Sequence, residues 1–133
     1  MGKILVIDDD PGFRRMINLT LTRANHQVVE AQDGNKGVRL FKEEQPDLVI
    51  SDIVMPEKEG IATILEIRVL SPGVPIIAMS GGGANIGLQY LEVAGKLGAN
   101  SILSKPFRPA DLLDLVNKLL TSTQHHKCGA DAW

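Results

Sequence analysis

The sequence predicts an α/β fold in which a parallel β-sheet is covered by helices on both faces. Two observations lead to this prediction. Short, continuous apolar runs alternate along the chain with longer segments that have helical spacing. The alternation repeats roughly every 20–27 residues, which is typical of successive strand–helix units in a parallel sheet.

The predicted strands are short apolar runs without a polar interruption. Runs of this kind are typical of strands that are buried on both faces of a sheet. Two of the runs are weaker than the others, which indicates edge or shorter strands. The stronger runs are Ile4–Ile7, Leu48–Ile50 and Ile76–Met79, and the weaker ones are Val28–Val29 and Ile102–Leu103.

The predicted helices follow from apolar residues at i, i+3, i+4 and i+7. Asp10 followed by Pro11 is an N-cap with proline in the first turn, which starts the first helix. Turn residues such as Asp33-Gly34 and Gln45-Pro46 separate the later segments. The apolar stripes are Phe13, Met16, Ile17 and Thr20; Ile61, Ile64 and Leu65; Leu88, Leu91, Val93 and Leu97; and Leu112, Leu115, Val116 and Leu119.

The composition indicates one soluble domain. The chain has 133 residues, a formal net charge of −2 and a single cysteine, which excludes an internal disulfide framework. It lacks the basic excess of a nucleic-acid-binding protein. It also has no apolar run long enough to span a membrane, and no signal peptide. We therefore expect a cytoplasmic protein with one domain over residues 1–120. Periodicity is lost after Leu120, so residues 121–133 are expected to form a disordered tail.

Polar residues follow four of the predicted strands. The carboxyl ends of parallel strands share one edge of the sheet, and ligands bind there, at the point where the strand order reverses. In a sheet of order 2-1-3-4-5 this point lies between the first and third strands. The residues that follow the strands are Asp8, Asp9 and Asp10; Ser51 and Asp52; Ser80; and Ser104 and Lys105.

These residue types indicate phosphoryl chemistry with a metal ion. Asp8, Asp9 and Asp52 would repel one another unless a cation joined them, and oxygen ligands with open positions suit Mg²⁺. Lys105 adds a compact positive charge for a phosphate oxygen, and Ser80 adds a hydroxyl donor. An aspartate in this setting can itself attack phosphorus. Asp10 is assigned to the helix cap instead.

These motifs resemble the receiver domain of two-component response regulators. The resemblance covers about residues 3–120 and implies a flavodoxin-like, doubly wound (βα)₅ fold with a five-stranded parallel sheet in the order 2-1-3-4-5. Four motifs carry it: Ile4–Pro11, Asp52–Gly60, Met79-Ser80 and Lys105-Pro106-Phe107.

The resemblance also implies a metal site and a phosphoacceptor. Asp52 would be the phosphoacceptor. Asp9 would bind Mg²⁺ directly, together with Asp52 and the main-chain carbonyl of Val54, while Asp8 would bind it through water. Ser80 would close on a phosphoryl oxygen.

Lys105 would pair with Asp52 and later with the phosphoryl group. Lys105-Pro106 is similar to the family's cis peptide. Pro56 and Gly60 would shape the loop that follows the acceptor.

Two positions depart from the family pattern. Ile102 occupies the position of a frequent aromatic switch residue, and Gly81–Gly83 follow the Ser80 position. The β-branched Ile102 cannot swing a ring inward, whereas glycines allow many backbone conformations. We therefore expect activation to order residues 81–87 rather than to move Ile102.

The function implied is a phosphorylation-dependent signalling switch. A histidine kinase or phosphotransfer protein would donate the phosphoryl group, and the modified domain would bind a downstream effector protein differently. It would dephosphorylate itself slowly rather than act as a turnover enzyme, with no direct nucleic-acid or membrane binding. A phosphorylation-dependent homodimer remains open. The sequence also leaves open whether the receiver is free-standing or part of a longer protein.

Two other classes compete with this interpretation. A Mg²⁺-dependent phosphatase with an aspartyl nucleophile would use Asp8-x-Asp10, but Pro11 and the short chain argue against it. A flavin-binding module would need a phosphate-binding loop after the first strand, where three aspartates would repel the phosphate.

Overall fold

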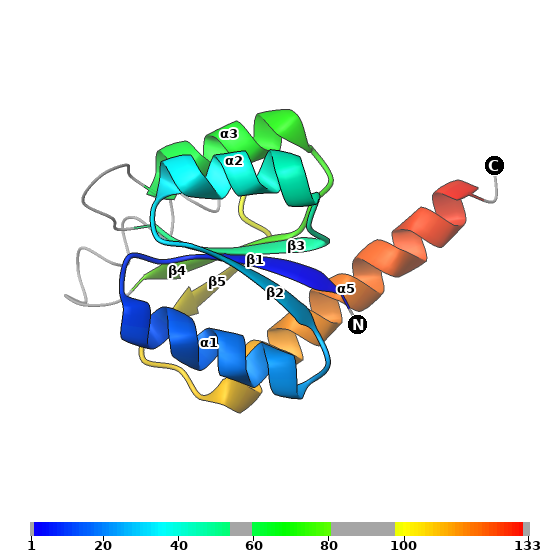
Figure 1. Cartoon of the computed structure of the whole chain (residues 1–133). Coiled ribbons are helices and arrows are strands. Elements are labelled where there is room, and N and C mark those ends of the chain that lie inside the picture. The colour runs from blue at the N-terminus through cyan, green and yellow to red at the C-terminus, as the bar shows by residue number, and fades with distance from the viewer. Residues whose placement is uncertain (1, 54–59, 81–97, 132–133) are drawn as a thin grey trace.

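Strands and helices alternate along the described residues as far as the fourth strand, and a fifth strand and a helix follow later in the chain (Figure 1). The computed structural model describes residues 2–53, 60–80 and 98–131, with side chains as far as residue 121. The strands are β1 (Lys3–Ile7), β2 (Gln27–Ala31), β3 (Leu48–Asp52), β4 (Ile76–Ser80) and β5 (Ser101–Ser104). The helices are α1 (Pro11–Arg23), α2 (Gly34–Glu44), α3 (Gly60–Leu70) and α5 (Pro109–Asp131).

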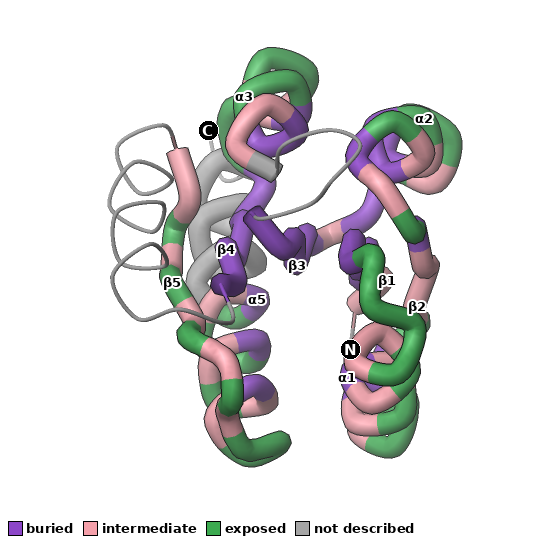
Figure 2. Tube along the Cα trace, turned by 90° about the vertical axis from the view of Figure 1, so that its left-hand side faces the viewer, coloured by how far each residue is buried: buried purple, intermediate pink, exposed green. Residues whose placement is uncertain are grey.

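The five strands form one parallel sheet in the order β2-β1-β3-β4-β5. This confirms the order that the family resemblance implies. β1, β3 and β4 are almost completely buried, whereas β2 and β5 lie at the edges and are partly exposed (Figure 2). The unbroken apolar runs therefore mark the central strands, as expected for strands that are covered on both faces.

Helices cover both faces of the sheet. α2 and α3 lie on one face, and α1 and α5 lie on the other (Figure 1). Two separate apolar cores result: Leu5, Ile7 and Val49 pack toward α2 and α3, while Ile4, Val6 and Ile50 pack toward α1 and α5. The alternation of side chains along each strand produces this division.

Local sequence signals define the starts of the first two helices. The Asp10 carboxylate caps α1 by accepting from the backbone N–H groups of Gly12 and Phe13, at 3.0 and 3.2 Å. Asp33 caps α2 in the same way. Gly37 permits close packing of α2 on β1, because a Cβ atom there would lie 2.5 Å from the Ile7 side chain.

The structure corrects one predicted stripe. Leu65 was expected in the core with Ile61 and Ile64, but it is 42% exposed, and Ile67 is buried instead. Apolar residues lie on several sides of helix α3 (GIATILEIRVL) and Thr63, Glu66 and Arg68 are its polar residues, so spacing alone cannot show which face meets the sheet.

Helix α5 extends beyond the predicted end of the domain. Residues 121–131, expected as a disordered tail, continue the helix to Asp131 and project past the edge where the strands begin (Figure 1). The segment Thr121–Lys127 contains neither Pro nor Gly, so helix propagation meets no backbone obstacle there.

Two expected features lie outside the described residues: the stripe from Leu88 to Leu97 and the Gly81–Gly83 loop. Among the described residues, no helix has the length and apolar character needed to cross a membrane.

Candidate acidic site at the carboxyl edge of the sheet

Three aspartates lie together at the carboxyl ends of β1 and β3. Asp8 follows β1 and Asp52 ends β3, and the parallel pairing of Ile7 with Ser51 brings these ends side by side. One carboxylate oxygen from each of Asp8, Asp9 and Asp52 lies within 4.8 Å of the others. Asp8 is fully buried and Asp52 is 6% exposed, whereas Asp9 faces solvent. An ion arriving from solvent would therefore meet Asp9 first.

Backbone hydrogen bonds fix the position of Asp8. Its N–H donates to the carbonyl of Ala31 at 3.1 Å, which extends the pairing with β2 by one residue. Its carboxylate oxygen Oδ1 accepts from the N–H of Asp10 at 2.9 Å. The other oxygen, Oδ2, faces Lys105.

Lys105 reaches the aspartates from the end of β5. Its Nζ atom donates to Asp8 Oδ2 at 2.8 Å and to Asp52 Oδ2 at 3.2 Å. Burial alone would lower the pKa of Lys105, but the hydrogen bond to Asp8 and the charge of Asp52 outweigh it and raise the pKa above its usual value. The group is thus held in its charged form. The Lys105-Pro106 peptide bond is cis, as the resemblance implies.

Arg14 supports the site from helix α1. Its Nη1 atom donates to the main-chain carbonyl of Asp8 at 2.7 Å, and its Nε atom pairs with Glu30 on β2 at 2.8 Å. The other oxygen of Glu30 accepts from the side-chain amide of Asn18 at 2.7 Å. Helix α1, strand β2 and the segment after β1 are thereby tied together beside the aspartates.

Ser80 lies at the end of β4, beside β3. Its side chain is buried, and its Oγ atom has no hydrogen-bond partner among the described residues. Burying a hydroxyl without a hydrogen-bond partner costs free energy, and such a group often has a functional role. The neighbouring buried serine, Ser51, differs, because its Oγ atom donates to the Asp52 carbonyl at 3.1 Å.

Several predicted site residues cannot be placed in the same way. Val54 and Pro56 lie outside the described residues, while Gly60 is the first residue of α3. Ile102 lies on the edge strand β5 and is 43% exposed.

The residues present fit a hard divalent cation. The donors are carboxylate oxygens, one aspartate is open to solvent, and the ammonium group that the described residues bring to the three carboxylates is that of Lys105. The excess of negative charge would be relieved by a cation and would otherwise repel a phosphate.

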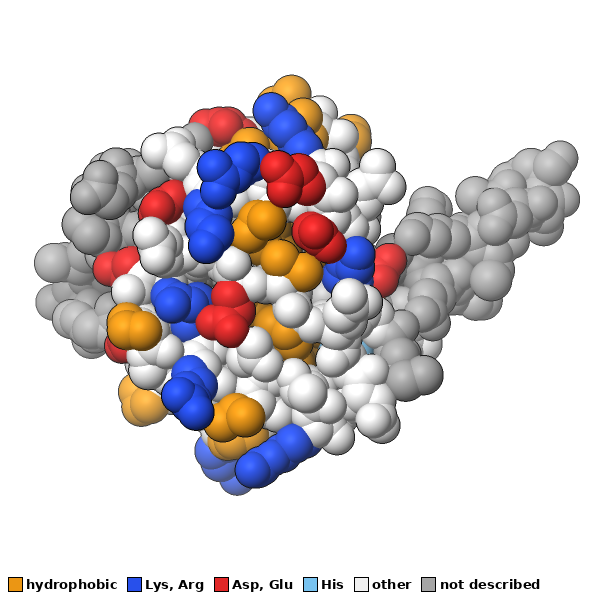
Figure 3. Space-filling model, viewed as in Figure 1, with side chains coloured by type: hydrophobic (Ala, Val, Ile, Leu, Met, Phe, Trp, Pro, Cys, Tyr) orange, Lys and Arg blue, Asp and Glu red, His pale blue; other side chains and the backbone are white. Residues whose placement is uncertain are grey.

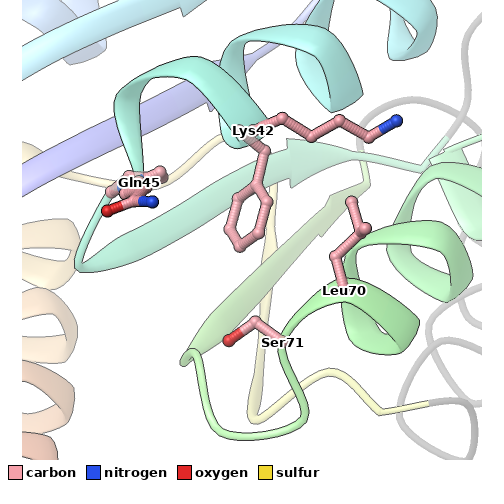
Figure 4. Close-up of a pocket in the computed structure, with 6 residues that line it drawn as sticks. Lys42, Gln45, Leu70 and Ser71 are labelled. Carbon is pink, nitrogen blue, oxygen red and sulfur yellow. The ribbon is translucent and has the colours of Figure 1, made fainter.

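Asp9 of the site also lines a surface hollow of about 270 Å³. A cavity of about 390 Å³ lies elsewhere, between the C-terminal ends of α2 and α3, where Leu70, Ser71, Gln45 and Lys42 surround it (Figure 4). None of the aspartates lines it. On the face shown in Figure 3, acidic and basic side chains are interspersed.

Sequence reasoning missed two residues beside the site, Phe13 and Arg14. Phe13 was assigned to the apolar stripe of the first helix, yet its ring lies under the Lys105 ammonium, with 4.0 Å from Nζ to the ring centroid. The available signal was that Phe13 and Arg14 lie in the first turn of the helix that follows the aspartates. A position in the first turn does not show where a side chain points.

The chain is similar to known receiver domains over most of its length. The family model described as "Response regulator receiver domain" matches residues 4–117. The chemotaxis protein CheY of Thermotoga maritima is 38% identical over 122 residues, which cover 90% of this chain and 98% of that protein. The transcriptional regulatory protein GlrR of Escherichia coli is 37% identical over 77% of this chain, but the match spans only 22% of GlrR.

Solved structures agree with these sequence matches. A receiver domain from Clostridium thermocellum has a TM-score of 0.86 and 31% identity, covering 93% of this chain and 98% of that one. NtrX from Brucella abortus has a TM-score of 0.91 and 25% identity, covering 99% of this chain but 29% of that one. Some relatives are thus matched over their full length, while in others the match is one part of a longer protein.

Proposed function

The chain belongs to the response regulator receiver domain family, and on this basis we propose that it is a phosphorylation-dependent signalling switch with Asp52 as the phosphoacceptor. The observation that carries the proposal is that Asp52 lies close to Asp8, Asp9 and Lys105 at one edge of the sheet. Asp52 lies on the central strand β3, where its position is fixed by neighbours on both sides.

The transfer is a displacement at phosphorus. A carboxylate oxygen of Asp52 forms a bond to phosphorus while the bond from phosphorus to the donor's histidine nitrogen breaks, and the imidazole leaves with the bonding electron pair. Later hydrolysis is a second displacement at phosphorus, in which water attacks and the Asp52 carboxylate leaves. The slow second step makes the chain a switch rather than a turnover enzyme.

Lys105 and Ser80 supply the positive charge and the hydrogen-bond donor. The Lys105 ammonium lies 3.2 Å from Asp52 Oδ2, so it is already beside the carboxylate that would receive the negatively charged phosphoryl group. Ser80 has a buried hydroxyl to which the described residues offer no partner, and a phosphoryl oxygen would satisfy it. That new hydrogen bond would pull on the end of β4 and carry the signal away from the site.

Asp9 and Asp52 would hold Mg²⁺ directly, with the Val54 carbonyl, and Asp8 would act through water. When bound, Mg²⁺ would neutralise charge on the transferring group. Both carboxylate oxygens of Asp8 already accept hydrogen bonds, whereas Asp9 faces solvent, which supports this division of roles.

The partners follow from the chemistry of the switch. The phosphoryl donor would be a histidine kinase or a phosphotransfer protein, and the recipient of the signal would be an effector protein. Relatives include proteins named for chemotaxis and for transcriptional regulation. A cytoplasmic location and a phosphorylation-dependent homodimer stay predictions.

The arrangement of Asp10 argues against the phosphatase alternative. In an Asp8-x-Asp10 pattern the second aspartate would act on substrate, but here its carboxylate caps α1. That assignment leaves the phosphatase without its second acidic group.

The test is labelling by acetyl phosphate with Mg²⁺, followed by intact-mass spectrometry. We expect one phosphoryl group on the native chain and none on Asp52→Asn. Asp114→Asn, which removes an exposed carboxylate from α5, should be labelled normally. Normal labelling of Asp52→Asn would overturn the proposal.

A second arm tests the metal. EDTA should stop labelling, and Asp9→Ala should weaken Mg²⁺ binding strongly, measured by calorimetry. Unchanged Mg²⁺ affinity in Asp9→Ala would show that Asp9 is a solvated loop residue.

A further inference from the structure

The ring of Phe13 lies under the ammonium group of Lys105, with Nζ 4.0 Å from the ring centroid. We propose that Phe13 is a positioning residue that holds Lys105 in place beside the aspartates through the negative face of its ring. The inference rests on the proposed function for its kinetic consequence, but the contact itself does not depend on it.

Within the described part of the chain, the ring is a third partner of the ammonium group. A lysine ammonium has three N–H donors. Two of them are directed to Asp8 and Asp52, at 2.8 and 3.2 Å, and the third partner is the ring of Phe13. The side chain of Lys105 is only 14% exposed, so the ring takes a place that water would fill at a surface lysine.

Phe13 is itself held by two contacts, one of its backbone and one of its ring. The N–H of Phe13 donates to the Asp10 cap at 3.2 Å, which places Phe13 in the first turn of α1. The ring meets Phe107 edge-to-face, with centroids 5.3 Å apart and planes at 89°. Phe107 lies two residues after Lys105, so the lysine and the ring that fixes Phe13 share one segment.

An aliphatic residue would fill the same space without attracting a cation. The face of an aromatic ring carries negative potential, and this attraction strengthens when the pair is shielded from water. The attraction between the ring and the ammonium group does not depend on whether Asp52 is phosphorylated, so Phe13 remains a constant partner for Lys105. If the ring attracts the ammonium group less strongly, the group is held less firmly beside Asp52, and phosphoryl transfer should become slower.

The first experiment changes only the ring potential. Phenylalanine with one, two and three fluorines, introduced at position 13, keeps the shape of the ring while its face becomes less negative. We expect the rate of labelling by acetyl phosphate at saturating Mg²⁺ to fall stepwise, by about fivefold over the series. The same series at Phe41, a buried ring on the opposite face of the sheet, is the matched control and should leave the rate unchanged.

The second experiment is a double-mutant cycle between the two residues. Phe13→Leu should slow labelling by about fivefold in the native chain and should have no effect in a Lys105→Met chain. An equal effect in both backgrounds, or a labelling rate that ignores fluorination at position 13, would overturn the proposal and leave Phe13 as a packing residue.

Urea unfolding without phosphodonor separates this proposal from the proposed function. The proteins compared are the native chain, Phe13→Leu, Lys105→Met and the double variant. A loss of stability in Phe13→Leu that shrinks in the Lys105→Met chain supports the contact even if no protein is labelled. Absence of labelling in the native chain overturns the proposed function, and additive losses of stability overturn the role of Phe13.

Discussion

Lys105 lies closer to Asp8 than to Asp52: its Nζ atom is 2.8 Å from Asp8 Oδ2 and 3.2 Å from Asp52 Oδ2. Asp8 is the aspartate with no solvent exposure, so it depends most on this neighbouring charge. The lysine therefore has two roles, since it neutralises a buried carboxylate and also faces the proposed phosphoacceptor.

Replacement of Lys105 by Met should destabilise the protein in EDTA. Loss of the ammonium removes a positive charge from beside the buried Asp8 and Asp52, and we expect the free energy of unfolding to fall by about 3 kcal/mol. Because the remaining site is more negative, Mg²⁺ should stabilise the variant more than the native chain. Urea unfolding with and without Mg²⁺ measures both effects.

Lys3→Met is the control for this experiment. It removes the ion pair with Glu44, which lies at the opposite edge of the sheet. Its stability should respond to Mg²⁺ as that of the native chain does. An equal Mg²⁺ response in Lys105→Met would contradict the role of Lys105 in charge balance.

Lys105→Ala should still accept a phosphoryl group, because Asp52 and the metal ligands remain, but should transmit the change poorly. Equal binding of a phosphorylation-dependent partner by this variant and the native chain would make Lys105 structural only.

Arg14 and Glu30 should be energetically coupled. A double-mutant cycle with Arg14→Met and Glu30→Gln should give a coupling of about 1 kcal/mol that weakens in high salt, since the pair is partly exposed. Arg15→Met removes the same charge from the next position, where the side chain is exposed, and should change stability by less than about 0.5 kcal/mol. Equal effects at the two arginines would refute the bond from Arg14 to the Asp8 carbonyl.

Ser80→Ala and Ser51→Ala should act in opposite directions. The buried Ser80 hydroxyl has no partner in the part of the chain that the structure describes, so its removal should raise the free energy of unfolding by up to about 1 kcal/mol. Ser51 has a partner, so its removal should lower that energy by about 1 kcal/mol. Labelling of Asp52 should persist in Ser80→Ala. A marked loss of stability in Ser80→Ala would show that its hydroxyl is already satisfied.

Beryllofluoride, which mimics a phosphoryl group, should protect residues 81–87 from hydrogen exchange more than it protects the strand of Ile102. Ile102 is already 43% exposed on an edge strand and has no ring to move inward. Ser80→Ala should suppress the protection. Protection confined to Ser101–Ser104 would contradict this prediction.

Stability should fall as the pH drops below about 6.5 because of His26. Burial and the charge of the amino terminus lower the pKa of His26, outweighing a hydrogen bond with Asn117 that raises it. Its Nδ1 atom accepts from the N–H of Gly2 at 3.1 Å, which requires an unprotonated nitrogen. The unfolded chain thus takes up a proton at a higher pH than the folded one. The stabilisation is present above the unfolded pKa and is lost as the pH falls toward the folded pKa.

Urea unfolding at pH 7.5, 6.5 and 5.5 checks this, with His26→Gln as the comparison. The variant should lose less stability over this range than the native chain. Parallel pH profiles would assign the acid sensitivity to other groups.

Much of the fold and of the candidate site could be predicted because the signals are local. The apolar runs identify the central strands, and Asp10-Pro11 identifies the start of α1, since each depends on residues that are neighbours in the chain. The end of α5 was not predictable in this way. A polar segment without Pro or Gly is compatible with helix or coil, and composition does not distinguish the two.

By itself, the sequence determined that Asp8, Asp9, Asp52, Ser80 and Lys105 follow strands of a parallel sheet, because an apolar run and the polar residue after it are adjacent in the chain. Only the tertiary structure decided how these groups pair. It set Lys105 nearer to Asp8 than to Asp52 and placed Phe13 beneath the ammonium and Arg14 on the Asp8 carbonyl. It also left the Ser80 hydroxyl without a partner among the residues it describes. Such pairings depend on side-chain directions and on the packing of α1 against the sheet, which join residues up to 97 positions apart and leave no local trace in the sequence.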